Sequence, residues 1–234
     1  LLSVNERPAW RVIKGGSRSY LDKLVEGHRD RIRLNSGVEW IRRHPEYIEV
    51  KARETEVERY DRVFLACHSD QALALLDDPT TQEQEVLGAI EYQQNEAVLH
   101  TDASLMPRRK RAWAAWNYHI PPGQADPDGR VTLTYNMNIL QSLQAPVEFC
   151  VTLNHTQAID PKKVIQVIQY SHPVFTEKAV AAQKHHRTIN GANRTYFCGA
   201  YWRYGFHEDG VVSALNAVDH FLEDLPGAES EHDK

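Results

Sequence analysis

The stretch from Tyr196 to Val218, YFCGAYWRYGFHEDGVVSALNAV, most constrains the fold, because it joins a short apolar run to a long amphipathic one. Residues 195–198, TYFC, have the length and the continuous apolar character of a buried strand, and Gly199 ends it. From Val211 onward, apolar residues recur at the i, i+3, i+4, i+7 spacing of an amphipathic helix. The sequence therefore predicts a strand, a glycine-bearing loop and a helix that packs one face on a sheet.

Two interpretations of this junction remain open on spacing alone. Gly205 and Gly210 lie in the loop, and a glycine at a helix start lets a ligand approach free backbone amides. The helix dipole favours a phosphate at that place, so a phosphorylated ligand is one interpretation. The other is a structural turn in which Asp209 is the N-cap of the helix.

The first third of the chain predicts a strand-rich meander that leads into a second buried strand. That strand is RVFLAC, residues 62–67, which is apolar throughout, as a strand covered on both faces should be. Before it we expect an apolar strand ahead of Gly15, then a helix from Ser17 to Gly27. Further strands are predicted at residues 32–34, 38–41, 48–51 and 57–60. Helices are predicted at residues 68–76 and 81–90.

The middle of the chain predicts a mixed or antiparallel sheet. Its four candidate strands are residues 97–101, 111–118, 130–136 and 149–153. We expect a short helix at residues 138–143 and another at residues 176–186. A third helix is predicted to start at Asp160-Pro161, with Val164, Ile165 and Ile168 as its apolar face.

Composition excludes several classes of protein. The net charge of −5 and the pI near 6.2 argue against general nucleic-acid binding, and no apolar run approaches the length of a membrane span. Three widely separated cysteines suggest neither a disulfide framework nor a zinc site, and no histidine pair has convincing metal spacing. We therefore expect no metal and a cytoplasmic location. The chain begins Leu1-Leu2-Ser3-Val4, with no initiator Met and no signal peptide, which suggests a piece of a longer protein.

Three segments, in order, resemble the flavin-containing amine oxidase superfamily. FCGAYWRYGFHEDGVVSALNAV resembles its carboxy-terminal flavin motif, in which a strand ending F-x-G precedes a loop and a glycine-started helix. VIKGGSRSYLDKL is similar to its Gly-Gly-x helix start. IRLNSGVEWIRR, followed by DRVFLACHSDQALALL, is similar to its V-x-x-I strand, meander and D-x-V-I-x-A segment. More narrowly, the chain resembles the branch called predicted NAD/FAD-binding proteins; the matches cover residues 12–76 and 195–222.

The resemblance implies a set of cofactor-binding residues. Val38 would meet the adenine end of FAD through its backbone, and Cys67 would lie close to the dinucleotide. Gly199 would sit beside the ribityl phosphate, while Gly210 and Val211 would offer amides to the flavin or its phosphates. The family has an acidic residue at or soon after the F-x-G glycine. Ala200 and Tyr201 stand there in this chain, so that contact is in doubt.

One family element is missing from the sequence. The superfamily opens with a strand, G-x-G-x-x-G and a helix, followed by an acidic residue for the ribose. Nothing in the 234 residues matches it, and Gly15-Gly16 lacks the third glycine and the downstream acid. The chain thus resembles the last half of a flavoenzyme. We expect it to bind FAD poorly or not at all by itself.

The implied reaction is hydride removal from a C–N or C–C bond of a small-molecule substrate by flavin. Candidate substrate-lining residues are Trp116, Tyr118, Trp202 and Tyr204, although aromatic residues on strands are more often core or cross-strand pairs. No catalytic residue is identified. The basic run Arg108–Arg111 attracts an acidic partner or is a solvated loop, and the histidines and cysteines have structural explanations.

The sequence therefore predicts an α+β fold with an incomplete FAD/NAD(P)-binding domain built from both chain ends and an inserted mixed-sheet substrate domain. The predicted bounds are residues 1–76 and 190–225 for the first, 77–189 for the second, and 226–234 for a disordered tail. The leading function is the carboxy-terminal portion of an amine-oxidase-type FAD-dependent oxidoreductase. The alternatives are a carotenoid-desaturase-like flavoenzyme on an apolar substrate, and a non-catalytic module that keeps the fold without flavin. Substrate, electron acceptor and oligomeric state are not predicted.

Overall fold

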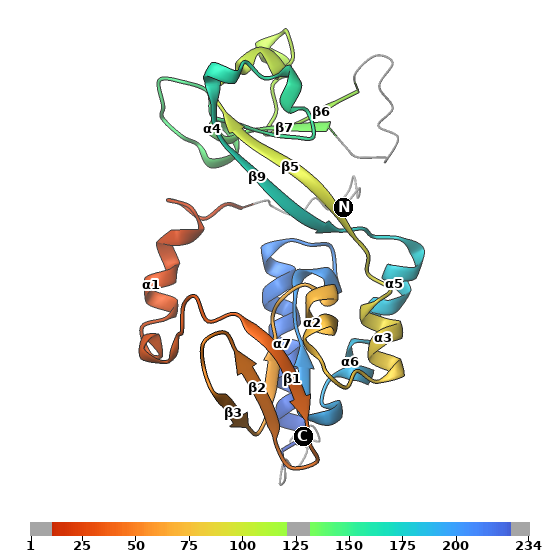
Figure 1. The fold of residues 1–234 in the computed structure, drawn as a ribbon. Helices are drawn as coiled ribbons and strands as arrows, with labels where there is room; N and C mark the ends of the chain where they lie inside the picture. Colours follow the sequence, from red (N-terminus) through yellow and green to blue (C-terminus); the bar gives the residue numbers. More distant parts are fainter. Residues whose placement is uncertain (1–10, 121–131, 226–234) are drawn as a thin grey trace, which may run out of the picture. The chain divides into compact units, whose positions relative to one another are not determined.

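The chain forms two compact units of mixed helix and sheet in a computed structural model that describes residues 11–120 and 132–225 (Figure 1). One unit, here the middle unit, comprises the described residues up to Ile32 together with Gln94–Ser171. The other, here the end unit, comprises Arg33–Gln93 and the described residues from His172 onward.

These bounds differ from the predicted division of the chain. Residues 77–93 and 172–189, predicted to belong to the inserted domain, lie in the end unit, while residues 11–32 group with the middle unit. The assignment of the parts to cofactor and substrate stays a prediction. The predicted tail, residues 226–234, lies outside the described residues.

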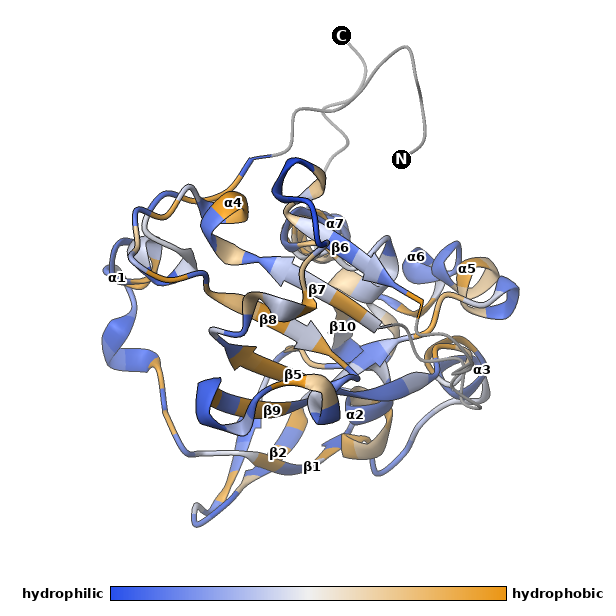
Figure 2. Cartoon of the chain, turned by 90° about the horizontal axis from the view of Figure 1, so that it is seen from above, coloured by the Kyte–Doolittle hydropathy of each residue, from blue (hydrophilic) through white to orange (hydrophobic). Residues whose placement is uncertain are grey.

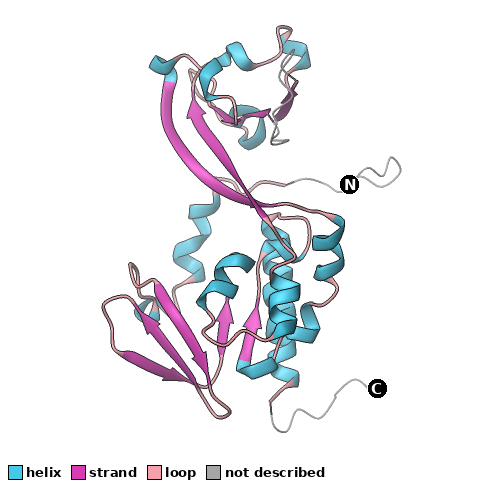
Figure 3. Ribbon diagram, turned by 45° about the vertical axis from the view of Figure 1, so that its right-hand side comes forward, coloured by secondary structure: helices cyan, strands magenta, loops and turns pink. Residues whose placement is uncertain are grey.

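The end unit contains a three-stranded antiparallel sheet, a two-stranded parallel sheet and the helices around them (Figure 3). Its strands are β1 (Val38–Arg43), β2 (Ile48–Ala52), β3 (Val57–Tyr60), β4 (Val63–Leu65) and β10 (Thr195–Phe197). Its helices are α2 (Ser69–Leu75), α3 (Thr81–Leu87), α5 (Glu177–Gln183), α6 (His186–Ile189) and α7 (His207–Glu223), with short 3₁₀ turns η7 (Ala192–Arg194) and η8 (Ala200–Trp202). The strands predicted at residues 48–51 and 57–60 are confirmed as β2 and β3, which pair antiparallel.

The two apolar runs that were predicted to be buried strands pair with each other. Although they are far apart in the sequence, β4 and β10 lie side by side and parallel, with Phe197 opposite Leu65. All three residues of β10 are buried, whereas Phe64 in β4 is 39% exposed, so β4 is covered less completely than predicted.

The outer edge of β10 is closed by the loop that precedes it. The Phe197 amide donates to Asn190 Oδ1 at 2.6 Å, and the Gly191 amide donates to the Thr195 carbonyl at 2.9 Å. Gly191 has a φ of 89°, and an added Cβ would lie 2.0 Å from an Asp224 carboxylate oxygen. Within the described residues, β4 pairs with no strand other than β10. In the part of the chain that the structure describes, the parallel sheet is therefore closed at β10 and open at β4.

The core of the end unit combines apolar packing with one buried ion pair. Ile41, Ile48 and Phe197 are among its fully buried side chains. Arg43 and Glu83 are both 1% exposed in their side chains, and Arg43 Nη2 donates to Glu83 Oε2 at 2.9 Å. The pair joins β1 to α3, which the apolar pattern did not indicate.

The middle unit is built on a five-stranded sheet in the order β6-β7-β8-β5-β9. Its strands are β5 (Tyr92–His100), β6 (Trp116–His119), β7 (Thr132–Asn136), β8 (Cys150–Leu153) and β9 (Val164–Pro173), of which β5 and β9 begin or end in the end unit. Its helices are α1 (Leu21–Leu24) and α4 (Met137–Gln141), with 3₁₀ turns η1 (Ser17–Tyr20), η2 (Arg29–Arg31), η3 (Ala103–Leu105), η4 (Lys110–Ala112), η5 (Thr156–Ala158) and η6 (Pro161–Lys163). Apolar residues are visible on β5 and β8 in Figure 2.

A row of buried polar side chains crosses this sheet. Thr152 Oγ1 lies 2.7 Å from His100 Nε2 and 2.9 Å from Thr134 Oγ1. The Asp102 amide donates to His100 Nδ1, so His100 donates through Nε2. Burial lowers the pKa of His100. The strands are thus joined by satisfied hydrogen bonds as well as by apolar contacts.

Three predicted elements are wrong. The helix predicted from Asp160-Pro161 is a single 3₁₀ turn followed by strand β9, because its β-branched Val and Ile residues pair beside β5. Residues 11–13 and 32–34 were predicted as strands but make no sheet pairing with the described residues.

None of the helices in the described ranges is long and apolar enough to cross a membrane.

Candidate functional site

The segments that follow β4 and β10 form the candidate site, because ligands of parallel α/β sheets bind beyond the carboxyl ends of the strands. Cys67 and His68 follow β4, and Cys198 and Gly199 follow β10. The Cys198 amide donates to the Leu65 carbonyl at 3.0 Å, which continues the pairing past the last residue of β10. The two segments therefore leave the sheet together.

Gly199 is required by packing rather than by backbone conformation. Its φ of 166° is extended, but an added Cβ would lie 2.3 Å from Cε1 of Tyr201. Its amide donates to Ser213 Oγ at 2.8 Å, and Ser213 donates to the Gly210 carbonyl at 2.9 Å. The fully buried Ser213 thereby ties the end of the strand to the first turns of α7.

Helix α7 begins at His207, four residues before the predicted start at Val211. Asp209 is its third residue, not its N-cap, and Asp209 Oδ2 accepts the amides of Tyr204 (3.2 Å) and Phe206 (3.0 Å). The Gly210 amide donates to the Phe206 carbonyl at 3.2 Å. Gly210 and Val211 therefore lie inside the helix and not at its start, where the free amides are.

The first turn of α7 is also acidic. Glu208 and Asp209 both lie in it, and Asp209 is buried. Carboxylates at this place already interact favourably with the helix dipole. A phosphate there would be opposed by Glu208 and, less strongly, by Asp209, whose Oδ1 lies 3.5 Å from Arg203 Nε, so the geometry favours an uncharged group next to this turn.

Two polar atoms beside Gly199 are buried and unsatisfied. Tyr201 and Trp202 are 4% and 5% exposed, and within the described residues neither the Tyr201 hydroxyl nor the Trp202 indole N–H has a hydrogen-bond partner of acceptable geometry. Burial raises the pKa of Tyr201 well above its ordinary value. Buried donors without acceptors are rare in folded proteins and call for a specific explanation.

The surroundings of Tyr201 are apolar and uncharged. The ionisable groups that lie close enough to affect the pKa of Tyr201 are Tyr92, Cys67 and Cys198. Burial raises the pKa of Cys67 and of Cys198, so both stay thiols at neutral pH and neither is an activated nucleophile. The Tyr92 hydroxyl accepts the Ser69 amide at 2.9 Å. The polar groups around Tyr201 are therefore neutral hydroxyls and thiols and not charged side chains.

The structure brings together some of the predicted site residues. Cys67 and Gly199 lie at the ends of paired strands, and the position of a Cβ on Gly210 would be 3.9 Å from Ala200 Cβ, so Ala200 and α7 are in contact. Val38 is the first residue of β1, in the other sheet, and is 38% exposed.

The predicted substrate-lining aromatic residues have different environments. Trp202 is a core residue whose ring lies 4.3 Å from that of His186, whereas Tyr204 is 64% exposed. Trp116 and Tyr118 lie on one face of β6 in the middle unit, and Trp116 makes an edge contact with Tyr135. Their role as substrate contacts stays a prediction.

The sequence did not point to Tyr92, Gln183 or Ser213 as part of this site. Gln183 donates to the carbonyls of Tyr201 (2.8 Å) and Arg203 (2.6 Å) and thus holds η8 in place. Only the run CGAYW carried a signal, because a buried Tyr and Trp directly after a glycine imply close packing. Among the described residues, no group of three or more His, Cys, Asp or Glu side chains is placed to hold a metal ion.

Comparison with known proteins shows the fold. Neither a protein-family model nor a curated relative matches the sequence. Cyclohexylamine oxidase from Brevibacterium oxydans IH-35A superposes with a TM-score of 0.59 at 10% identity, over 89% of this chain and 53% of that protein. The A394C mutant of putrescine oxidase gives a TM-score of 0.58 at 12% identity, over the same shares of the two chains. A CLA-producing fatty acid isomerase from P. acnes gives 0.52 at 16%, over 80% of this chain and 47% of the other.

The chain therefore has part of the fold of these amine oxidases. At this level of identity the likeness extends to the fold alone. The chain spans about half the length of each of the three proteins, 47% to 53%. The mixed α+β class is confirmed, and the superfamily resemblance stays a prediction.

Proposed function

We propose that this chain is the carboxy-terminal portion of an FAD-dependent oxidoreductase of the amine-oxidase type. In the intact protein, flavin would accept a hydride from a C–N or C–C bond of a small-molecule substrate in the cytoplasm. The observation that carries the proposal is the parallel pair of β4 and β10, whose F-x-G end joins an amine-oxidase-like fold that covers about half of such proteins.

The open edge of β4 supports a cofactor domain that is completed by further polypeptide. Purely parallel sheets occur with more strands than two and with both faces covered. Since loop residues 190–191 close the edge of β10, an additional strand would join at β4. A strand that carries G-x-G-x-x-G would thereby come to lie beside Cys67.

The outer face of α7 supports the same conclusion. The inner face packs Ala217 and Ser213 against the strands, while Val211, Leu215, Val218 and Leu222 are 42–58% exposed along the opposite side. A helix that is apolar on both faces is normally covered on both. In the intact protein, an adjoining layer of the cofactor domain would cover the outer face of α7.

The residues of the site fit the flavin end of FAD better than its phosphate end. Tyr201 and Trp202 offer unsatisfied buried donors, and Gly199 and Ala200 bring the backbone close to α7. We assign Gly199, Ala200 and Gly210 to the wall beside the flavin, and Cys67 and Val38 to the dinucleotide; Val211, on the outer face of α7, is not part of that wall. The acidic first turn of α7 does not suit the pyrophosphate, which is the group that a G-x-G-x-x-G turn would hold.

A second candidate function keeps the cofactor and changes the substrate. The fold likeness to a fatty acid isomerase favours an enzyme that acts on an apolar chain, as in the carotenoid-desaturase-like alternative. A non-catalytic module that keeps the fold without flavin is the third candidate function.

The test is the visible absorption spectrum of the purified chain after incubation with FAD and desalting, beside the same protein extended at its amino terminus through its coding sequence. Flavin retained by the extended form alone supports the proposal. If neither form retains flavin, the oxidoreductase proposal is refuted and the non-catalytic module is the function that is left. Anaerobic reduction of the bound flavin by primary amines or by unsaturated fatty acids then separates the two enzyme candidates.

A further inference from the structure

A concave pocket of about 380 Å³ lies in the middle unit, apart from the strands that carry the candidate site. It opens between the loop after η3, strand β6 and turn η5. This volume falls within the range of sites that hold small organic molecules. Its lining residues are Ser104, Leu105, Met106, Pro107, Arg108, Asn117, Tyr118, His119, His155 and Ala158.

The polar part of the lining is basic. Among the described residues it includes Arg108, His119 and His155 but no carboxylate, and Arg109 and Lys110 follow in the same loop. Within the described residues, the Arg108 guanidinium makes no hydrogen bond or ion pair. A cation without a counter-ion at the rim of a pocket attracts an anion.

The nearest buried carboxylate does not neutralise this charge, because its oxygens are already engaged. Asp102 Oδ1 accepts the Ser104 amide at 3.2 Å and lies 3.0 Å from Lys163 Nζ. Asp102 Oδ2 accepts the Asp160 amide at 2.9 Å. Asp102 thus fixes the base of η3, and its counter-ion is Lys163.

The two histidines lie in edge-to-face contact in the lining of the pocket. Their ring centroids are 5.5 Å apart and the rings are nearly perpendicular, at 88°. The Gln157 amide nitrogen lies 3.4 Å from Nδ1 of His155, so Nδ1 accepts and Nε2 is the donor. Burial, and then the charge of His119, lower the pKa of His155. An anion between Arg108 and the two rings would stabilise their protonated forms.

The walls of the pocket are held firmly. Asn117 Nδ2 donates to the carbonyls of Ala114 (2.7 Å) and Thr134 (3.2 Å), which fixes the start of β6. Trp113 Nε1 donates to the Pro107 carbonyl at 2.7 Å and fixes the loop that carries Arg108. The apolar side chains Leu105, Met106 and Ala158 complete the lining and provide a surface for a compact apolar group.

We propose that this pocket binds a small organic oxyanion, a carboxylate or a phosphate monoester with a compact apolar body, through Arg108, His119 and His155. The site does not depend on flavin or on the proposed oxidoreductase activity. It gives a specific role to part of the basic run of residues 108–111, which the sequence left between an acidic partner and a solvated loop.

The test is a titration of the chain with phenyl phosphate and benzoate, with inorganic phosphate and the neutral benzamide beside them, followed by the imidazole signals of His119 and His155 in NMR spectra. Phenyl phosphate or benzoate should bind and shift both histidines, benzamide should not, and affinity should rise as the pH falls from 8 to 6. Arg108→Ala should weaken binding by about tenfold or more.

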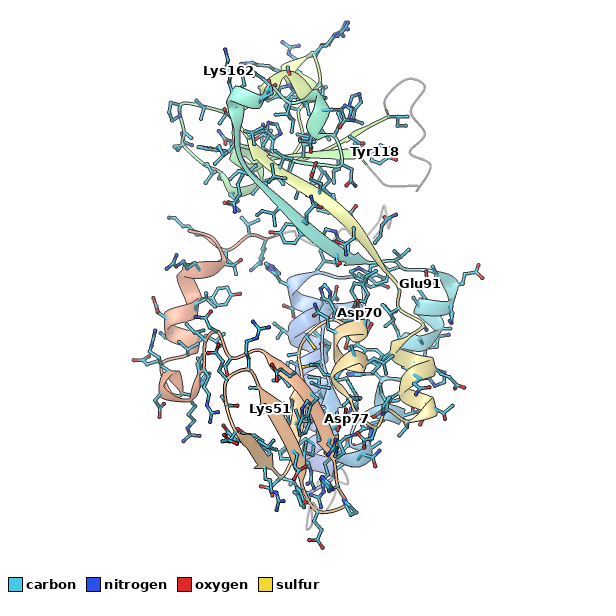
Figure 4. The ribbon with its side chains drawn as sticks, in the orientation of Figure 1. Lys51, Asp70, Asp77, Glu91, Tyr118 and Lys162 are labelled. Carbon is cyan, nitrogen blue, oxygen red and sulfur yellow. The ribbon has the colours of Figure 1, made fainter. Side chains whose placement is uncertain are left out.

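Two control variants separate a site from general attraction to a basic loop. Arg109→Ala removes the same charge from the adjacent position, which does not line the pocket, and should leave the affinity within about twofold. Lys162→Ala removes a charge from a residue that does not line the pocket and that is drawn away from Tyr118 in Figure 4, and it should also leave the affinity within about twofold. Equal losses for Arg108→Ala and Arg109→Ala, binding of benzamide, or unmoved histidine signals would overturn the proposal. Since Arg108 is exposed, its variant is expected to fold, which circular dichroism checks.

Discussion

Replacement of Gly199 by alanine tests the packing at the end of β10. The new Cβ would lie 2.3 Å from Cε1 and 2.7 Å from Cδ1 of Tyr201, closer than any tolerated contact. The Tyr201 ring has no room to retreat, because it is 4% exposed and its centroid lies 5.2 Å from that of Trp202. The backbone at φ 166° accepts alanine, so the whole cost arises from the ring.

Overpacking of a buried site costs about 1–3 kcal/mol, and we place Gly199→Ala at about 2–3 kcal/mol because the clash involves an enclosed ring. For a chain of this size that corresponds to a fall in Tm of about 4–12 °C. Gly210→Ala is the matched control. Its Cβ would meet Ala200 at an ordinary 3.9 Å inside helix α7, so it should stabilise the protein by about 0.5–1 kcal/mol.

The assay is urea unfolding of the two variants, followed by hydrogen exchange of the peptide that contains β10 and η8, so that the end unit is observed by itself. A double-mutant cycle with Tyr201→Ala isolates the contact. The cost of Gly199→Ala should disappear in the Tyr201→Ala background. A loss below about 0.5 kcal/mol, or an unchanged loss without the ring, would refute the packing argument.

Three further outcomes are expected. Glu83→Ala should destabilise the protein by about 3 kcal/mol in urea unfolding, at the lower end for a broken buried pair, because Arg43 stays buried with Asp78 Oδ1, 3.0 Å from its Nε, as its counter-ion. Asp22→Ala at an exposed ion pair should have no measurable effect. Burial lowers the pKa of His186, so just below pH 6.5 the His186 side chain is protonated in the unfolded chain but not in the folded one. The free energy of unfolding should therefore fall as the pH drops from 7.5 to 5, and it should fall less steeply in His186→Gln. Thermal melts across that pH range measure this. Burial raises the pKa of Cys150 to about 11, so its modification by a disulfide reagent at pH 8 should be slow until the chain unfolds; rapid labelling of the native protein would contradict this.

The buried strands of the end unit were predictable because their residues are apolar without interruption. RVFLAC and TYFC contain the observed β4 and β10. Their pairing was not predictable from periodicity, since about 130 residues separate them along the chain, and only the family resemblance placed them in one domain.

The errors arose where several local signals competed. The run VIQVIQ has apolar residues at positions that suit a helix face, but the stiffness of Val and Ile and the neighbouring β5 favoured a strand. At α7, Asp209 fitted the N-cap rule but acts from the third position, which moved the helix start to His207. An N-cap carboxylate accepts from amides that follow it, whereas a carboxylate at the third position accepts from amides that precede it, and the residue pattern alone does not separate the two.

The site was predicted only in its backbone glycines. Gly199 could be proposed from the F-x-G pattern, yet the side chain that requires a glycine there, Tyr201, was considered only for its lack of charge. The hydrogen bonds of Ser213 and Gln183 join segments that only the fold brings together, and a single sequence contains no signal for these hydrogen bonds.

The asymmetry of the parallel sheet limits how copies of this chain associate. An exposed strand edge is a template for pairing with another chain. Each copy offers one such edge, at β4, because loop residues 190–191 block the other. Two copies of the chain as given that joined through β4 would use both of these edges, whereas in the proposed intact protein the additional strand would occupy β4 and leave no edge of this sheet for a second copy.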